Sequence, residues 1–230
     1  MTVLEKIKGG LIVSCQALED EPLHSSFIMA RMAKAAAQGG ACGIRANSVQ
    51  DITEIKKITD LPVIGIIKKD YKDSPVYITP TMEEVDALVG CGCEIIAADA
   101  TNRPRPNGET LDVFFAKARK KYPSQLFMAD CATYKEGMNA AELGFDLTGT
   151  TLCGYTEESK NDTVPNIDMM SVLVSNSRIP VIAEGNIWTT EQLRMVLNCG
   201  VHAVVIGSAI TRPMLITRRF VNVINGEHNR

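Results

Sequence analysis

Three charged side chains are candidates for acid–base chemistry, because each one follows an apolar run that is typical of a buried strand. Lys68 follows LPVIGII, Asp130 follows LFMA and Glu184 follows PVIA. A lysine among charges of both signs in a closed site can have its pKa lowered toward neutrality, and it can then accept a proton. No histidine has a comparable place, and no Ser-His-Asp order or nucleophile elbow is visible. These residues suit the removal of a proton next to a carbonyl group.

Two glycine-containing turns could hold a phosphate group, because each follows one of the last two apolar runs. They are Gly185-Asn186 and Gly207-Ser208, and the second turn opens a segment with helical character. Glycine lets the backbone approach an anion, and the free N–H groups at a helix start point toward it. One such turn often serves backbone geometry alone, but two turns in these places favour a phosphate site. Arg212 lies just beyond and could clamp the anion, or it could be an ordinary helix-surface arginine.

Eight short apolar runs are expected to form the strands that position these residues. The runs show no clean alternation of polar and apolar residues, which indicates a parallel sheet that is buried on both faces. The expected strands are 10–15, 41–46, 62–68, 94–100, 126–130, 145–151, 180–185 and 203–208. The expected helices are 25–38, 48–58, 81–90, 109–121, 134–143, 166–176, 189–198 and 209–224.

The alternation of strands and helices predicts that residues 1–230 form a single α/β domain, a (β/α)8 TIM barrel. An open doubly wound sheet is the second choice, because no glycine-rich dinucleotide turn follows the first strand. In a barrel, the active site lies at the C-terminal ends of the strands. Those ends carry polar residues, among them Gln16, Arg45 and Lys68. One charge at a strand end is more often a solvated loop residue, but its repetition around the barrel favours a site.

The composition argues against several classes of function. The chain has 230 residues, a formal net charge of −3 and seven cysteines. The acidic balance argues against nucleic-acid binding through a basic face. The N-terminus does not resemble a signal peptide, and no apolar run approaches the roughly 20 residues of a membrane span, so we expect a cytoplasmic protein. The cysteine spacing fits no zinc site, which predicts reduced thiols and no bound metal.

Seven segments resemble the bacterial N-acetylmannosamine-6-phosphate 2-epimerases. They are GGLIVSCQA, GIRA, LPVIGIIK-x-DY, ADAT-x-RPRP, MADC-AT, GTTLCGYT and IAEG-x-I. The resemblance runs from about residue 9 to residue 224, which is nearly the whole chain. The resemblance implies a barrel of the ribulose-phosphate-binding type. It also implies an enzyme of sialic acid catabolism that converts N-acetylmannosamine 6-phosphate to N-acetylglucosamine 6-phosphate without a nucleotide or metal cofactor. The chain departs from the family at Lys69, where related sequences often carry arginine, and alternation predicts that only one of Lys68 and Lys69 points inward.

The resemblance also assigns roles to the candidate residues. Lys68 would remove the C2 proton of the ring-opened sugar. Glu184 would be a second acid/base or a hydrogen-bond anchor, and Asp130 would bind the sugar or relay a proton. Gln16 and Arg45 would hold the carbonyl, the enolate oxygen or the N-acetyl group. The resemblance leaves open whether one base or two serve the two faces of C2, and it favours a homodimer.

Two other functions stay open at this stage. A Schiff-base aldolase on the same barrel would use Lys68 to form an imine with its substrate. Such aldolases commonly place the lysine on a different strand, and the sixth strand ends in Thr148-Gly149-Thr150 without one. A sugar-phosphate sensor would bind its ligand without turnover, although the presence of both Lys68 and Glu184 argues against it.

Overall fold

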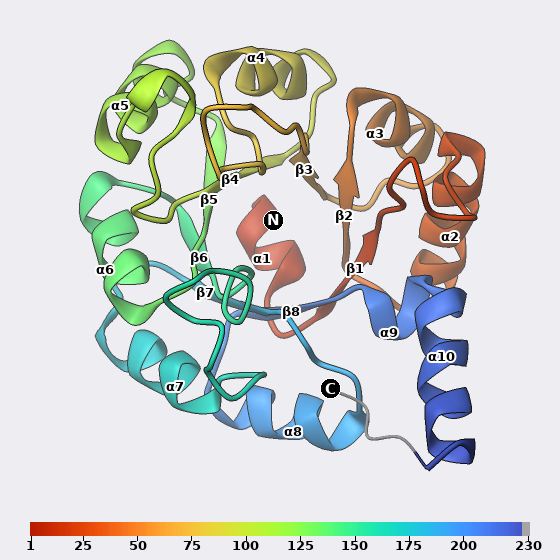
Figure 1. Cartoon of the computed structure of the whole chain (residues 1–230). Coiled ribbons are helices and arrows are strands. Elements are labelled where there is room, and N and C mark those ends of the chain that lie inside the picture. The colour runs from red at the N-terminus through yellow and green to blue at the C-terminus, as the bar shows by residue number, and fades with distance from the viewer. Residues whose placement is uncertain (227–230) are drawn as a thin grey trace.

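Eight parallel strands form a closed barrel, in which each strand pairs with the next and β8 pairs with β1 (Figure 1). The structure is a computed structural model and describes residues 1–226. The strands are β1 Leu11–Cys15, β2 Gly43–Asn47, β3 Val63–Ile66, β4 Ile95–Asp99, β5 Leu126–Asp130, β6 Leu147–Gly149, β7 Val181–Glu184 and β8 Ala203–Ile206. The helices are α1 Val3–Ile7, α2 Ser26–Gln38, α3 Val49–Lys56, α4 Met82–Gly90, α5 Leu111–Lys121, α6 Tyr134–Leu143, α7 Ile167–Asn176, α8 Thr190–Asn198, α9 Ser208–Thr211 and α10 Pro213–Ile224, with a 3-10 turn at Pro106–Gly108. The predicted TIM barrel is confirmed.

Two boundaries differ from the expectation in ways that affect the site. Strand β3 ends at Ile66, so Lys68 lies in the following loop, where it forms an antiparallel bridge with Ile78. The single helix expected over 209–224 was wrong, because α9 and α10 are separate and meet at Arg212. Pro213 explains the break: its ring disfavours a helical conformation at the preceding residue and suits the first position of a new helix.

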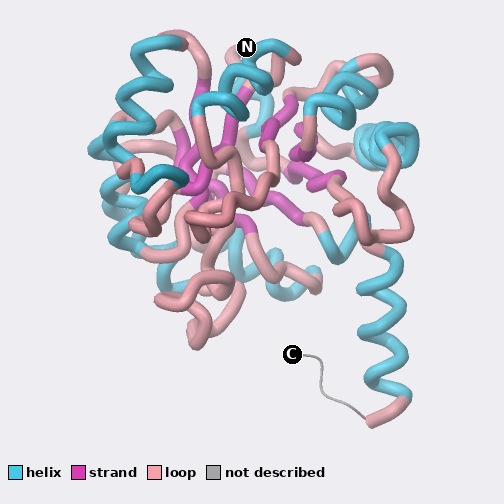
Figure 2. Tube along the Cα trace, turned by 45° about the horizontal axis from the view of Figure 1, so that its top comes forward, coloured by secondary structure: helices cyan, strands magenta, loops and turns pink. Residues whose placement is uncertain are grey.

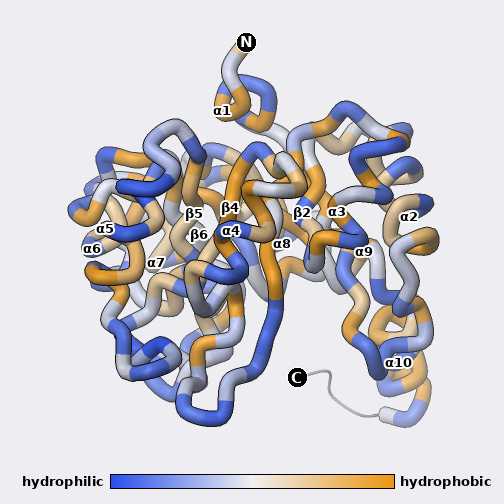
Figure 3. The backbone as a smooth tube through the Cα atoms, turned by 90° about the horizontal axis from the view of Figure 1, so that it is seen from above, coloured by the Kyte–Doolittle hydropathy of each residue, from blue (hydrophilic) through white to orange (hydrophobic). Residues whose placement is uncertain are grey.

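Apolar side chains fill the barrel interior and close one of its ends. Ile12, Ile64 and Ile182 are buried there in one cluster. Helix α1 lies at the N-terminal end of the barrel (Figure 3), and its Ile7, 1% exposed, belongs to the same cluster. The C-terminal ends of the strands form the opposite end, and the loops that follow them carry the polar residues.

Helix α10 projects away from the barrel (Figure 2), and Arg219 of this helix lies 4.3 Å from the ring centroid of Trp188. None of its residues is buried, and Phe220, Val223 and Ile224 are 70%, 66% and 82% exposed. An apolar groove lies elsewhere on the outer face, lined mainly by residues of β1, α2 and the turn after α2. Within residues 1–226, no helix is long and apolar enough to cross a membrane.

Candidate active site

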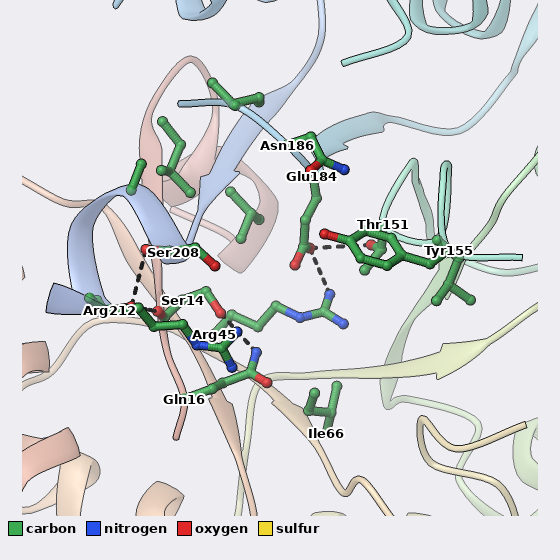
Figure 4. A pocket seen from close by; sticks show the side chains of 18 of the residues that line it. Ser14, Gln16, Arg45, Ile66, Thr151, Tyr155, Glu184, Asn186, Ser208 and Arg212 are labelled. Carbon is green, nitrogen blue, oxygen red and sulfur yellow. Dashed lines mark hydrogen bonds and ion pairs between the residues drawn. The ribbon is translucent and has the colours of Figure 1, made fainter. Parts of the chain in front are cut away.

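A cavity lies at the C-terminal ends of the strands, and Figure 4 shows it from close by. Nine of the ten predicted site residues line it. The nine are Gln16, Arg45, Lys68, Glu184, Gly185, Asn186, Gly207, Ser208 and Arg212. The tenth, Asp130, is fully buried and does not line the cavity. Segments that are far apart in the sequence therefore form one site, as the strand-end pattern predicts.

Arg45 is the centre of a buried charge network at the wall of the cavity. Its guanidinium donates to both carboxylate oxygens of Asp130, with Nη2 to Oδ2 at 2.6 Å and Nη1 to Oδ1 at 3.1 Å. Nη1 also lies 2.9 Å from Oε2 of Glu184. Thr151 donates to Asp130 at 2.6 Å and lies 3.2 Å from Glu184. Figure 4 shows both Thr151 and Arg45 directed toward the Glu184 carboxylate. The network holds the arginine and the glutamate in one arrangement, because paired and hydrogen-bonded charges are the ones that tolerate burial.

Lys68 enters the cavity with a lowered pKa. Its backbone N–H donates to Oδ1 of Asn47 at 2.8 Å, which fixes the loop after β3 against β2. Burial is the largest cause that lowers the pKa of Lys68, to about 8, and the nearby Arg212 and Arg45 lower it further. Lys69 points the other way and pairs with Glu84 at 3.1 Å. The prediction that only one of the two lysines points inward is confirmed.

Glu184 has a raised pKa, because burial disfavours the charged form of a carboxyl group as it does that of a lysine. Burial raises it most, to about 7, and the negative charge of Asp130 adds to the rise. Arg45, the hydrogen bond from Thr151 and the charge of Lys68 act in the opposite direction. Lys68 and Glu184 thus line the same cavity with pKa values close to neutrality, which is the range that general acid–base catalysis requires.

The two glycine turns lie on the cavity wall with distinct backbone constraints. Gly185 has a φ of +109°, which an L side chain rarely adopts, and Asn186 follows in the left-handed region at +58°. A Cβ on Gly207 would lie 3.2 Å from Cβ of Ser14, so glycine allows β8 to end close to β1. Thr211 donates to the backbone oxygen of Ser14 at 2.8 Å and holds α9 against β1. The N–H groups of Ile210 and Thr211 donate to the backbone oxygen of Gly207 at 2.8 and 2.9 Å, which forms the first turn of α9.

Two buried polar atoms among the described residues have no hydrogen-bond partner, and both belong to side chains of this cavity. They are Oε1 of Gln16, an acceptor, and Nε of Arg45, a donor. The amide nitrogen of Gln16 donates to Oγ of Ser14 at 2.8 Å, so that end of the side chain is fixed. An unsatisfied buried polar group costs about 1–3 kcal/mol. A ligand that presents both a donor and an acceptor would relieve this cost.

Several residues that line the cavity were not predicted from the sequence. Thr151 lies two residues beyond the observed end of β6, and its position in the strand predicted over 145–151 was the available signal. Tyr77 and Tyr155 come from the long loops after β3 and β6. Trp188, the only tryptophan of the chain, follows the predicted Gly185-Asn186 turn closely. The seven cysteines are free thiols in the structure, and residues 1–226 contain no cluster of His, Cys, Asp or Glu suited to a metal ion. The absence of a cofactor stays a prediction.

Comparisons with known proteins agree on one family. The family described as "Putative N-acetylmannosamine-6-phosphate epimerase" matches residues 29–226. A curated 2-epimerase of that description from Enterobacter sp. (strain 638) is 57% identical over 225 residues, which cover 97% of this chain and 96% of the relative. Another from Clostridioides difficile (strain 630) is 56% identical over 222 residues, which cover 96% of this chain and 99% of the relative. The solved structure of the N-acetylmannosamine-6-phosphate 2-epimerase from Clostridium perfringens superposes with a TM-score of 0.92 at 52% identity, covering 97% of this chain and 96% of that one. A thiamine phosphate pyrophosphorylase from Pyrococcus furiosus, at 18% identity and a TM-score of 0.63, shares the fold.

Proposed function

The chain belongs to the N-acetylmannosamine-6-phosphate epimerase family, and we propose that it interconverts N-acetylmannosamine 6-phosphate and N-acetylglucosamine 6-phosphate in sialic acid and amino-sugar catabolism. The observation that supports this most is the pairing of Lys68 and Glu184 in one cavity, with pKa values of about 8 and about 7. Action in the cytoplasm is part of the proposal.

Proton transfer at C2 is the proposed reaction. Opening of the sugar ring exposes the C1 aldehyde, which makes the C2 hydrogen acidic. Neutral Lys68 takes this proton, the C–H electron pair becomes the C1–C2 double bond, and the negative charge moves to O1. A proton returns to the opposite face of C2 from the Glu184 carboxyl group, and both side chains then recover their starting forms by exchange with solvent. Positioned donors stabilise the enolate, which is commonly the largest contribution to such catalysis.

The orphaned atoms of Gln16 and Arg45 fit the substrate's polar groups. Nε of Arg45 is a charged donor suited to O1 as negative charge develops on it. Oε1 of Gln16 is an acceptor suited to the N–H of the acetamido group. In this proposal Asp130 positions Arg45, since it contacts Arg45 and Thr151 and does not line the cavity.

The phosphate is proposed to bind at the far wall of the cavity. Gly185 and Asn186 after β7, with Gly207 and Ser208 at the start of α9, would present backbone N–H groups. Arg212 would add a charged side chain to the same anion. This end of the site selects for phosphorylated sugars.

A conversion assay tests the function directly. Purified protein is incubated with N-acetylmannosamine 6-phosphate or with unphosphorylated N-acetylmannosamine, and the products are separated by chromatography. We expect N-acetylglucosamine 6-phosphate to form from the first and little change in the second. Absence of conversion by folded protein would rule the proposal out.

A Schiff-base aldolase is the second candidate, because a lysine with a pKa of about 8 is also suited to imine formation. Borohydride trapping in the presence of substrate separates the two. A covalent adduct on Lys68 identifies the aldolase, and epimerisation without an adduct identifies the epimerase.

We further propose a homodimer in which α10 of each chain packs against the other copy. In a complete barrel, the helix after β8 covers the outer face of the sheet. Here α10 buries none of its residues, and the apolar groove between β1 and α2 includes Leu11, Val13 and Met32. The apolar face of α10 from a second copy fits this groove, and a two-fold axis makes both contacts equivalent.

A further inference from the structure

Glu21 and Arg212 form an ion pair at the edge of the cavity. Arg212 lies at the break between α9 and α10 and lines the cavity. Glu21 belongs to the loop that joins β1 to α2, and its Oε1 lies 2.8 Å from Nη2 of Arg212. The side chains of Arg212 and Glu21 are 24% and 15% exposed, so the pair is partly shielded from water. It joins the first loop of the barrel to its last.

A carboxylate next to an anion site either competes with the anion or holds the arginine in place. Glu21 does not line the cavity, so its carboxylate does not occupy the space open to a phosphate. The ion pair engages one terminal nitrogen of the guanidinium, and a guanidinium has five N–H donors. Within residues 1–226, Glu21 is the one ion-pair partner of Arg212. The remaining donors can therefore face the cavity while Glu21 holds the group from outside.

We propose that Glu21 is a positioning residue that fixes the Arg212 guanidinium for the phosphate of the substrate. This inference rests on the proposed function and concerns the same site. Without Glu21, the long arginine side chain at a helix break is free to adopt other rotamers. Phosphate binding then carries the entropic cost of ordering that side chain.

Lys68 offers an independent readout of where Arg212 lies. After burial, Arg212 and Arg45 lower the pKa of Lys68, and Glu184 and Glu21 raise it. Glu21→Ala removes the Glu21 carboxylate in either case, and the effect of Arg212 on the pKa of Lys68 is the larger of the two. If the variant also releases Arg212 from the cavity, the larger, lowering effect is lost, and the Lys68 limb of the pH–rate profile moves to higher pH. If Arg212 stays in place, only the carboxylate is lost, and the limb moves to lower pH.

The test compares Glu21→Ala, Arg212→Ala and the double variant in the epimerisation assay, with inorganic phosphate as a competitive inhibitor. We expect Glu21→Ala to raise KM and the phosphate inhibition constant by on the order of tenfold, the worth of one charge-assisted hydrogen bond. We expect kcat to change by less than about twofold, because the contact is made equally in the ground state and the transition state. The double variant should bind substrate and inorganic phosphate no more weakly than Arg212→Ala does, since Glu21 acts through Arg212.

Glu19→Ala is the matched control, because Glu19 is an exposed carboxylate of the same loop. It should leave every constant unchanged, and circular dichroism melts show whether each variant is folded. Glu21→Asp restores the charge and should recover part of the lost phosphate affinity. An unchanged KM in Glu21→Ala, a Lys68 limb that moves to lower pH, or effects that add fully in the double variant would overturn the inference. The parental protein is measured in the same assay, so failure of the proposed function is seen separately.

Discussion

Lys68 and Glu184 carry the proposed chemistry because their surroundings bring two dissimilar pKa values together. In water, a lysine and a glutamate titrate about six units apart. In the cavity, burial lowers the pKa of Lys68 to about 8 and raises that of Glu184 to about 7. Each group can therefore gain or lose a proton near neutral pH.

The pH dependence of kcat/KM follows from these two groups. We expect the rate to be greatest between the pKa of Glu184, about 7, and that of Lys68, about 8. At lower pH both groups are protonated and no base remains, and at higher pH both have lost their protons and no acid remains. Initial rates measured across this range test the expectation. A rate that keeps rising well above the pKa of Lys68 would remove Glu184 from the role of acid.

Thr151→Val should shift this profile in one direction. Oγ1 of Thr151 lies 3.2 Å from Oε2 of Glu184, and the hydrogen bond lowers the pKa of that carboxyl group. Valine keeps the shape and removes the donor, so we expect the Glu184 limb to move to higher pH by up to about one unit. Thr53→Val, an exposed position in α3, is the control and should leave the profile in place. A limb that moves to lower pH would contradict the assignment.

Sequence reasoning located the charged residues of the site because they end apolar runs in a repeating pattern. Lys68 and Glu184 could be placed in this way without any coordinates. Tyr77 could not be placed in this way, because a loop whose two arms pair with each other brings it to the cavity. In this loop the backbone N–H of Lys69 donates to the backbone oxygen of Tyr77 at 3.0 Å. The ion pair between Glu21 and Arg212 could not be predicted either, because it depends on where the chain bends at Arg212.

At the scale of elements, loops and helix starts are joined by shared side chains. Thr133 caps α6 in a reciprocal arrangement with Glu136. The buried carboxylate of Glu136 also accepts backbone N–H groups of Ala132 at 2.9 Å and of Asn102 at 3.0 Å. One side chain therefore fixes the start of α6 and the loop after β4 together.

Glu136→Ala should destabilise the fold more than Thr133→Ala. The first change removes an acceptor for three backbone N–H groups, those of Asn102, Ala132 and Thr133. We expect it to lower the free energy of unfolding by about 2–4 kcal/mol, against about 1 kcal/mol for loss of the threonine cap. Chemical denaturation of both variants measures the difference. Equal losses would show that the buried carboxylate has no special role.

The strands were predictable because continuous apolar runs are typical of a sheet that is buried on both faces. The division of the last helix was not predicted, although Pro213 is the kind of residue that starts a helix. Apolar residues continue on both sides of Pro213, so the pattern of apolar residues gave no sign that the helix is divided there. That break places Arg212 on the cavity and lets α10 leave the barrel.

At the scale of the whole molecule, the exposed face of α10 and the uncovered groove are the features that a lone chain leaves unexplained. Large exposed apolar patches commonly mark interaction surfaces. The proposed second copy would explain both features at once, because it would supply a helix for the groove and cover the exposed face of α10. The expectation that residues 1–230 form a single domain stays a prediction, and one cooperative unfolding transition would support it.

Phe220→Asp should separate the dimer into single chains. Phe220 is 70% exposed in one chain, so a charge there has little effect on an isolated barrel. In the proposed dimer it would place an unpaired charge within an apolar contact, which is strongly unfavourable. Light scattering should give twice the chain mass of 25.0 kDa for the parental protein and the chain mass for the variant. Val113→Asp in α5 is the control, and a parental protein with the mass of one chain would refute the dimer.

Proton NMR in D₂O with N-acetylmannosamine 6-phosphate tests the central claim, proton transfer at C2 within this cavity, most directly. For the parental protein we predict growth of the N-acetylglucosamine 6-phosphate signals with deuterium in place of the C2 proton, and for Lys68→Ala we predict neither product nor exchange. Glu184→Gln should exchange deuterium into one epimer without forming the other. Product that keeps its C2 proton, or a substrate that stays unchanged with folded parental protein, would contradict the account.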